Sequence, residues 1–186
     1  MKIADADIRI IPGLGNSPSE HWQRRWAERF STGQVIEQDE WDRPLRPDWV
    51  ARIQREVERA EKPVVLIGHS LGVIAIAHAA AGLPQGKVRG ALLVSPPDLE
   101  SEDVISGLPH EVGSFRDAPR DPLPFPSLLV ASNTDPYVST DRAADLASAW
   151  GSDLHLAGDA GHINVASGHG PWPEGLLMFT RLMQRI

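Results

Sequence analysis

The sequence predicts a single α/β domain, residues 1–186, in which helices cover both faces of a doubly wound, mostly parallel sheet. Short runs of β-branched and aliphatic residues recur along the chain, and several lack the polar alternation of a half-exposed strand. Segments with helical spacing of apolar residues separate these runs, and this alternation is typical of an α/β sheet. The length of 186 residues suits one domain.

Six of the aliphatic runs are the expected strands. They are Ile8–Ile11, Val35–Glu37, Val64–Ile67, Ala91–Val94, Leu128–Ala131 and Leu154–Leu156. Runs without polar alternation are expected in central strands that are buried on both faces.

Five segments between the runs are compatible with helices. They are Glu20–Phe30, Trp49–Glu61, Leu71–Ala81, Asp141–Trp150 and Glu174–Arg185. In the second segment Val50, Ile53 and Val57 recur at intervals of three and four residues, so this helix is expected to bury one stripe. The third segment is apolar nearly all round and is expected to be the most buried helix.

Residues 96–127 interrupt the alternation of strands and helices. This stretch of 32 residues holds seven prolines, and one short helix is expected in it, near Leu99–Ser106. A long irregular connection in a compact α/β domain is either a solvent-exposed loop or the border of an active site. Residues 96–127 are therefore a candidate minimal cap.

Composition and charge exclude several classes of function. Lys plus Arg number 18 against 25 Asp plus Glu, and this net charge of −7 disfavours binding to nucleic acid or to an anionic membrane. The absence of cysteine excludes disulfides, thiolate metal sites and a cysteine nucleophile. No apolar stretch approaches the ~20 residues of a membrane span. The amino-terminal residues lack the apolar segment of a signal peptide, so a cytoplasmic location is expected.

A candidate nucleophile follows the third expected strand, which continues into Gly68-His69-Ser70-Leu71-Gly72 and then into a helix. A serine on such a strand-to-helix turn has a strained backbone and presents its Oγ above the sheet, and the flanking glycines leave room for the turn. The backbone amide of Leu71, at the start of the helix, can bind an oxyanion there. The alternative is a Gly-Ser turn that only caps the helix.

A serine nucleophile needs a base, and the base needs an orienting acid. In folds with this nucleophile turn the acid and the histidine follow in that order, each after a later strand. Asp135 comes just after the fifth expected strand, and His162 lies in the loop after the sixth. Ser70, Asp135 and His162 are therefore expected to form a catalytic triad.

Other residues compete for these roles. Asp98 follows the fourth expected strand and is also a topologically permitted acid, whereas Asp159 is expected to shape the loop before the histidine. His169, further along the same loop, is the alternative base. A metal site built from His155, His162 and His169 would need ligands seven residues apart, which no common zinc motif uses. Neither a metal nor another cofactor is expected.

The loop after the first strand is the expected source of a second oxyanion donor. Gly13 allows the backbone to approach closely, and the amide of Leu14 is the expected donor beside that of Leu71. A dinucleotide-binding loop is disfavoured, because Pro18 stands three residues after Gly15 where that motif has its third glycine.

Several motifs together carry a resemblance to a known family. They are Pro12-Gly13-Leu14-Gly15 with His21-Trp22-Gln23, Gln38-Asp39 with Trp41-Asp42, the pentapeptide around Ser70, Ser95-Pro96-Pro97-Asp98, Pro122–Pro126, Ser132–Pro136, and Gly161-His162-Ile163-Asn164 through Gly168 to Trp172-Pro173. With them, essentially the whole chain resembles the α/β-hydrolase superfamily, and within it the small retinoblastoma-binding-protein-type, YdeN-like serine hydrolases. The resemblance implies a compact, nearly lidless α/β-hydrolase fold of about six strands, and the same triad. The retinoblastoma contact proposed for the mammalian relative uses a Leu-x-Cys-x-Glu motif, so a cysteine-free chain does not imply that partner.

The expected activity is that of a serine hydrolase, a carboxylesterase that acts on small esters through an acyl-enzyme intermediate. The small size of the stretch 96–127 favours short-chain or small esters over triglycerides. Two alternatives stay open. One is an amidase or peptidase with the same triad, and the other is a binding or scaffold protein of the same fold without activity.

Overall fold

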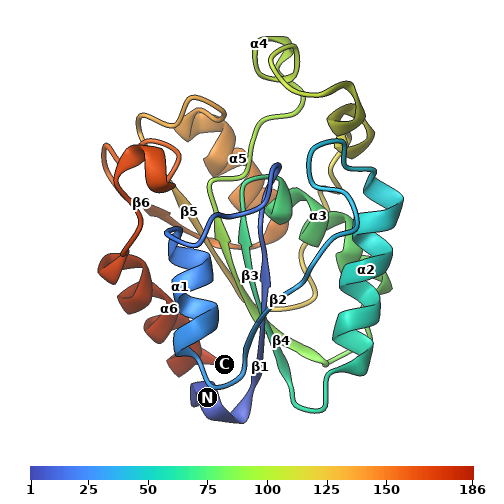
Figure 1. The fold of residues 1–186 in the computed structure, drawn as a ribbon, viewed down its shortest axis with the longest axis vertical. Coiled ribbons are helices and arrows are strands. Elements are labelled where there is room, and N and C mark those ends of the chain that lie inside the picture. The colour runs from blue at the N-terminus through green and yellow to red at the C-terminus, as the bar shows by residue number, and fades with distance from the viewer.

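The strands form one parallel sheet whose carboxyl ends lie at the same edge. A computed structural model describes residues 1–186 (Figure 1). The strands are β1 (Asp7–Ile11), β2 (Gly33–Val35), β3 (Val64–His69), β4 (Val88–Val94), β5 (Ser127–Ala131) and β6 (Asp153–Leu156). They lie in the order β2-β1-β3-β4-β5-β6, and every neighbouring pair is parallel. This confirms the predicted sheet, although β4 begins three residues before the expected run and β2 lies two residues before the run expected at Val35–Glu37.

Helices cover both faces of the sheet, as predicted. They are α1 (Trp22–Arg29), α2 (Arg46–Arg59), α3 (Leu71–Ala79), α4 (Glu102–Ile105), α5 (Thr140–Trp150) and α6 (Pro173–Arg185). Short 3-10 segments lie at Ile3–Asp5, Ala80–Gly82, His110–Phe115 and Val165–Ser167. One hydrophobic core lies under α1 and α6, and a larger one lies under α2, α3 and α5 (Figure 1). Alternate residues of β3 enter the two cores: Val65 and Ile67 the first, Leu66 the second.

The burial of α2 and α3 follows the sequence pattern. Ile53 and Val57 are buried as predicted, but Trp49 completes the buried stripe of α2 in place of Val50, which is only partly buried. Every residue of α3 except His78 is buried, because this helix packs on the sheet and under α2. The Nε2 atom of His78 lies 3.0 Å from the carbonyl oxygen of Phe115, so the one polar side chain of α3 has a partner.

The stretch 96–127 departs from the prediction. The helix expected near Leu99–Ser106 is shorter, at α4, and a second helical segment follows at His110–Phe115. Val112 and Phe115 of this second segment are buried, and the Phe115 ring meets the Trp49 ring of α2 at 5.6 Å between centroids. The segment is therefore held by packing against a distant helix, and its own six residues show no periodic pattern that would predict it.

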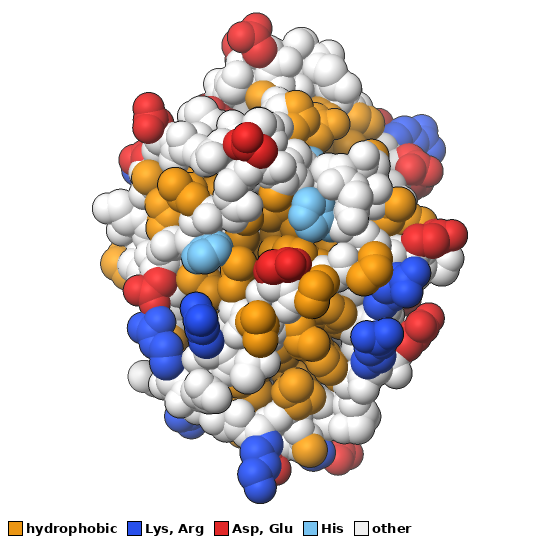
Figure 2. All heavy atoms as spheres, turned by 90° about the vertical axis from the view of Figure 1, so that its left-hand side faces the viewer, with side chains coloured by type: hydrophobic (Ala, Val, Ile, Leu, Met, Phe, Trp, Pro, Cys, Tyr) orange, Lys and Arg blue, Asp and Glu red, His pale blue; other side chains and the backbone are white.

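The surface over α1 and α6 mixes apolar and charged side chains. Figure 2 shows hydrophobic side chains that reach the surface between scattered basic and acidic ones. On α6 Leu177 is exposed, and Leu154 and Leu156 are exposed on the edge strand β6. None of the helices combines the length and the hydrophobicity needed to cross a membrane.

Candidate active site

Ser70 lies on the sharp turn between β3 and α3. Its backbone has a φ of +54° and a ψ of −127°, a strained conformation for a residue with a side chain. The turn is closely packed on both sides of the serine. A Cβ on Gly72 would lie 2.3 Å from the Ile11 carbonyl oxygen, and one on Gly68 would lie 2.7 Å from Ile76 Cδ1. Gly72 is therefore required, because its Cβ would meet fixed backbone, whereas a Cβ on Gly68 would first displace the end of the Ile76 side chain.

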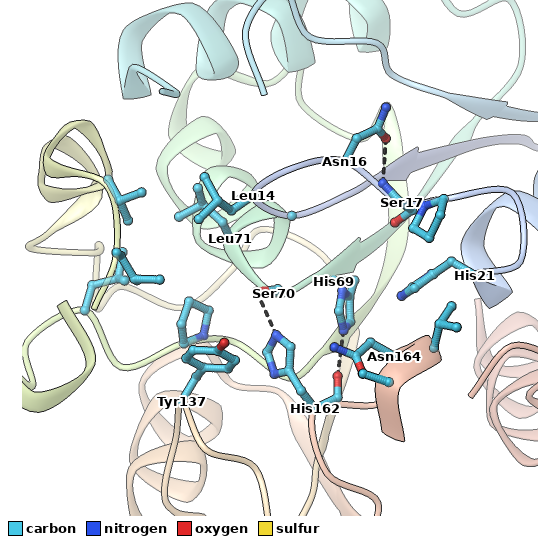
Figure 3. A pocket seen from close by; sticks show the side chains of 18 residues that line it. Leu14, Asn16, Ser17, His21, His69, Ser70, Leu71, Tyr137, His162 and Asn164 are labelled. Atoms are coloured by element: carbon cyan, nitrogen blue, oxygen red, sulfur yellow. Dashed lines mark hydrogen bonds between the residues drawn. The ribbon is translucent and has the colours of Figure 1, made fainter. Parts of the chain in front are cut away.

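The structure brings together the three residues predicted as a triad, and Figure 3 shows the contact between Ser70 and His162. The Nε2 atom of His162 lies 2.9 Å from Ser70 Oγ, and its Nδ1 atom lies 2.9 and 3.0 Å from the two carboxylate oxygens of Asp135. A carboxylate only accepts hydrogen bonds, so Nδ1 carries the imidazole proton. The unprotonated Nε2 then faces the hydroxyl of Ser70, as proton removal from a serine requires.

The alternative acid, Asp98, and the alternative base, His169, make hydrogen bonds outside the candidate triad. The carboxylate of Asp98 accepts from Arg142 Nε at 3.1 Å. Nδ1 of His169 lies 3.3 Å from Ser167 Oγ. Asp159 accepts a hydrogen bond from the side-chain amide of Asn133, in the loop after β5. This bond joins the loop that carries the candidate acid to the loop that carries the candidate histidine.

Further hydrogen bonds join these two loops. Ser132 Oγ accepts from the backbone amide of Ala160 at 2.9 Å, and Thr134 Oγ1 accepts from that of Gly161 at 3.0 Å. Both side chains bind backbone groups just before the candidate histidine, so they fix its distance from the acid. Sequence reasoning missed both residues, although they lie in the Ser132–Pro136 motif.

Three more side chains position His162, and the sequence analysis assigned none of them this role. His69 Nε2 lies 2.9 Å from the carbonyl oxygen of His162 (Figure 3). Trp22 Nε1 donates to the next carbonyl, that of Ile163, at 2.9 Å. The ring of Tyr137 packs against the His162 imidazole with 4.6 Å between centroids. His69 and Trp22 belong to motifs that were identified in the sequence. Their contacts with backbone carbonyls, however, cannot be predicted from those motifs.

The expected oxyanion loop packs directly on the serine turn. A Cβ on Gly13 would lie 2.8 Å from Ser70 Cβ and 3.3 Å from the Leu71 nitrogen, so only a glycine allows this approach. Leu71 is the first residue of α3, where a backbone amide has no partner within the helix. Leu14 and Leu71 both line the cavity in front of Ser70 (Figure 3).

Ser70 opens into a cavity of about 290 Å³ with two different walls. One wall is apolar and includes residues from the stretch 96–127. Its residues are Leu14, Leu71, Pro97, Leu99, Leu108, Val112 and Tyr137. The opposite wall is mixed, because polar side chains alternate there with apolar ones that include Val165 and Ala166. Its residues include Asn16, Ser17, Pro18, His21 and Asn164. No Lys, Arg, Asp or Glu lines the cavity.

Two histidines beside the triad are held in the neutral form. Burial, followed by the nearby His162 and His169 imidazoles, lowers the pKa of His21 to about 4. Burial, followed by the His162 and His21 imidazoles, lowers the pKa of His69 well below its usual value. A neutral His69 donates its Nε2 proton to the carbonyl oxygen of His162.

We expect the free energy of unfolding to decrease as the pH is lowered from 7 to 5, and to decrease less in a His21→Asn variant. Between pH 6.5 and about 4 unfolded His21 binds a proton that folded His21 does not bind. The stabilising contribution is therefore complete above pH 6.5 and is lost as the pH falls toward 4, at about 1.4 kcal/mol per pH unit. Urea denaturation at pH 7, 6 and 5 measures the free energy of unfolding. Equal pH slopes for wild type and variant would contradict the expectation.

Comparisons with known proteins agree with the fold and identify the family. A family model described as serine hydrolase matches residues 8–181. A solved structure from Pectobacterium atrosepticum, described as a YdeN-like hydrolase, is 36% identical with a TM-score of 0.83, and the match covers 98% of this chain and 93% of that one. No curated protein matches significantly.

More distant structures share the fold. The ydeN gene product of B. subtilis is 20% identical with a TM-score of 0.75, and the match covers 96% of this chain and 99% of that one. The esterase domain of a Rhodothermus marinus protein is 18% identical with a TM-score of 0.66, and the match covers 95% and 87% of the two chains. The chain therefore belongs to the serine hydrolase family, with the α/β-hydrolase fold, and is similar to YdeN-like hydrolases.

Proposed function

We propose that the protein is a carboxylesterase that cleaves small esters, with Ser70 as nucleophile, His162 as general base and Asp135 as orienting acid. The observation that carries this proposal is the unbroken chain of hydrogen bonds from Asp135 through His162 to Ser70 Oγ. The strained turn under Ser70 and the cavity in front of it give a substrate carbonyl access to that oxygen.

The reaction has two halves. Ser70 Oγ attacks the ester carbonyl while His162 Nε2 takes the hydroxyl proton, and the backbone amides of Leu14 and Leu71 bind the oxyanion. The imidazolium, stabilised by Asp135, then gives its proton to the leaving alcohol, and an acyl-enzyme remains. In the second half His162 takes a proton from water as the water attacks the acyl-enzyme, and it then gives that proton to Ser70 Oγ as the bond to the acyl group breaks and the acid leaves.

Size and polarity of the cavity favour small, uncharged substrates. A volume of about 290 Å³ is at the lower end of the range for ligand pockets. At about 30 Å³ for each water-sized group, it holds on the order of ten non-hydrogen atoms. Because no Lys, Arg, Asp or Glu lines it, a charged substrate would lose its hydration without gaining an ion pair. In this proposal the stretch 96–127 acts as a minimal cap that supplies part of the apolar wall.

Labelling with a fluorophosphonate probe tests the proposal. Wild type is expected to react, whereas Ser70→Ala and His162→Ala are expected to lose labelling, because the probe reports an activated serine. Ser106→Ala, which removes an exposed serine of the stretch 96–127, serves as the control and should label normally. Folded wild type without labelling would overturn the proposal and favour a binding or scaffold protein.

A second measurement separates an esterase from an amidase. It compares the rate at which the protein hydrolyses p-nitrophenyl acetate with the rate at which it hydrolyses acetanilides.

A further inference from the structure

The polar wall of the cavity presents a buried donor at His21. The Nδ1 atom of His21 accepts a hydrogen bond from the Gln23 backbone amide at 3.2 Å, so the ring proton is on Nε2. His21 is only 3% exposed, and its ring extends from the start of α1 toward the cavity (Figure 3). No group of the protein accepts a hydrogen bond from this Nε2. This atom is not among the fully buried polar atoms that lack a partner, so it is open to the cavity, where it can donate to water or to a ligand.

Asn164 adds a second donor on the same wall. Its Oδ1 accepts from the backbone amide and the hydroxyl of Ser167, at 3.0 and 3.2 Å. Because a backbone amide only donates, the atom facing it must be the oxygen, and the NH₂ group remains for the cavity. In both His21 and Asn164, therefore, the acceptor atom is used within the protein and the donor is left for a ligand.

The residues of the His21-Trp22-Gln23 motif hold this wall in place. Gln23 Oε1 accepts from Ser17 Oγ at 2.9 Å, which fixes the loop after β1. Trp22 Nε1 donates to the carbonyl of Ile163 at 2.9 Å, which fixes the residue just before Asn164. The start of α1 thus positions both sides of the polar wall, a role that the triad itself does not explain.

The absence of charge on the polar wall indicates which chemical group of a ligand it can bind. Burial keeps His21 neutral at pH 7, and no lysine or arginine lines the cavity. A carboxylate would lack a counter-charge there, and an ammonium group would face the donors of His21 and Asn164 instead of a carboxylate. An uncharged oxygen of an ether, a carbonyl or a hydroxyl matches two neutral donors.

We propose that His21 and Asn164 bind an uncharged acceptor oxygen in the alcohol part of the ester, while the acyl chain lies against the apolar wall. This inference rests on the proposed esterase function. The leaving alkoxide takes its proton from His162, and Asn164 lies two residues further on the same loop, so the alcohol part faces the polar wall. The apolar acyl chain then meets Leu99 and Leu108 of the opposite wall.

Two esters of equal size test the proposal, n-butyl butyrate and 2-methoxyethyl butyrate, which differ only in one CH₂ group replaced by oxygen. The quantity measured is kcat/KM for the methoxyethyl ester divided by kcat/KM for the butyl ester. His21→Asn keeps an acceptor that caps α1 but removes the Nε2 donor. We expect this ratio to fall about three- to tenfold in the variant, the worth of one hydrogen bond. Comparing ratios between proteins cancels the different intrinsic reactivity of the two esters.

A second variant and a control complete the experiment. Asn164→Asp keeps the acceptor for Ser167 but removes the amide donor, so it should lower the same ratio even if His21→Asn does not fold. His155→Asn, on β6 and outside the cavity, should leave the ratio unchanged.

The outcomes separate this inference from the proposed function. Hydrolysis of both esters with the same ratio in wild type, His21→Asn and Asn164→Asp would overturn the donor site and leave the esterase intact. No hydrolysis of either ester, together with no fluorophosphonate labelling of Ser70, would overturn the esterase and the donor site together.

Discussion

Replacement of Asp135 by asparagine is expected to lower kcat about 10⁴-fold without loss of the fold. The Asp135 side chain is fully buried, and both carboxylate oxygens lie within 3.0 Å of His162 Nδ1. An asparagine at this position offers an N–H to Nδ1, which favours the tautomer with the proton on Nε2. That tautomer cannot take the proton of Ser70. The measurements are kcat with p-nitrophenyl acetate and circular dichroism of the folded protein.

Asp98→Asn is the matched control, because Asp98 is the other acid that the chain order permits. Its carboxylate pairs with Arg142 at 3.1 Å and is partly exposed, so its loss should leave kcat nearly unchanged. The reverse result, with a large loss in Asp98→Asn and a small one in Asp135→Asn, would assign the acid to Asp98 and contradict the triad proposed here.

Chain order and strand ends were enough to select the residues that meet at the candidate site. Parallel strands present their carboxyl ends at one edge, so a serine after β3, an aspartate after β5 and a histidine after β6 gather there. The sequence favoured Asp135 over Asp98, which follows the strand before, but it left Asp98 open as an alternative because both residues follow strands. The selection depends on the side-chain contacts of His162 and of Arg142, which come from packing across the sheet.

The contacts that position His162 could not be predicted from the sequence, for a different reason. His69 and Trp22 bind backbone carbonyls of the loop that carries His162, and any residue type supplies a carbonyl. The helical segment at His110–Phe115 depends on burial against Trp49, which is more than sixty residues away in the chain. The secondary-structure propensity of a segment depends on its own residues, so it predicts neither kind of interaction.

Gly72→Ala is expected to destabilise the fold by about 3 kcal/mol or more, the upper end of the range for overpacked sites. The added Cβ would lie 2.3 Å from the carbonyl oxygen of Ile11 and 2.6 Å from that of Pro12. Both atoms belong to the backbone at the end of β1, which cannot rotate away as a side chain can. Relief of the clash would separate α3 from β1 and so displace Ser70 from the loop that carries Leu14.

Gly113→Ala provides the matched control for the loss of a glycine. Its Cβ would meet no atom within 4 Å and its φ is not positive, so the free energy of unfolding should change by no more than about 0.5 kcal/mol. Urea denaturation of the two variants and the wild type measures the difference. Equal stability of both variants would mean that α3 can move away from β1 at little cost, and that the close approach at Gly72 is not what holds the nucleophile turn.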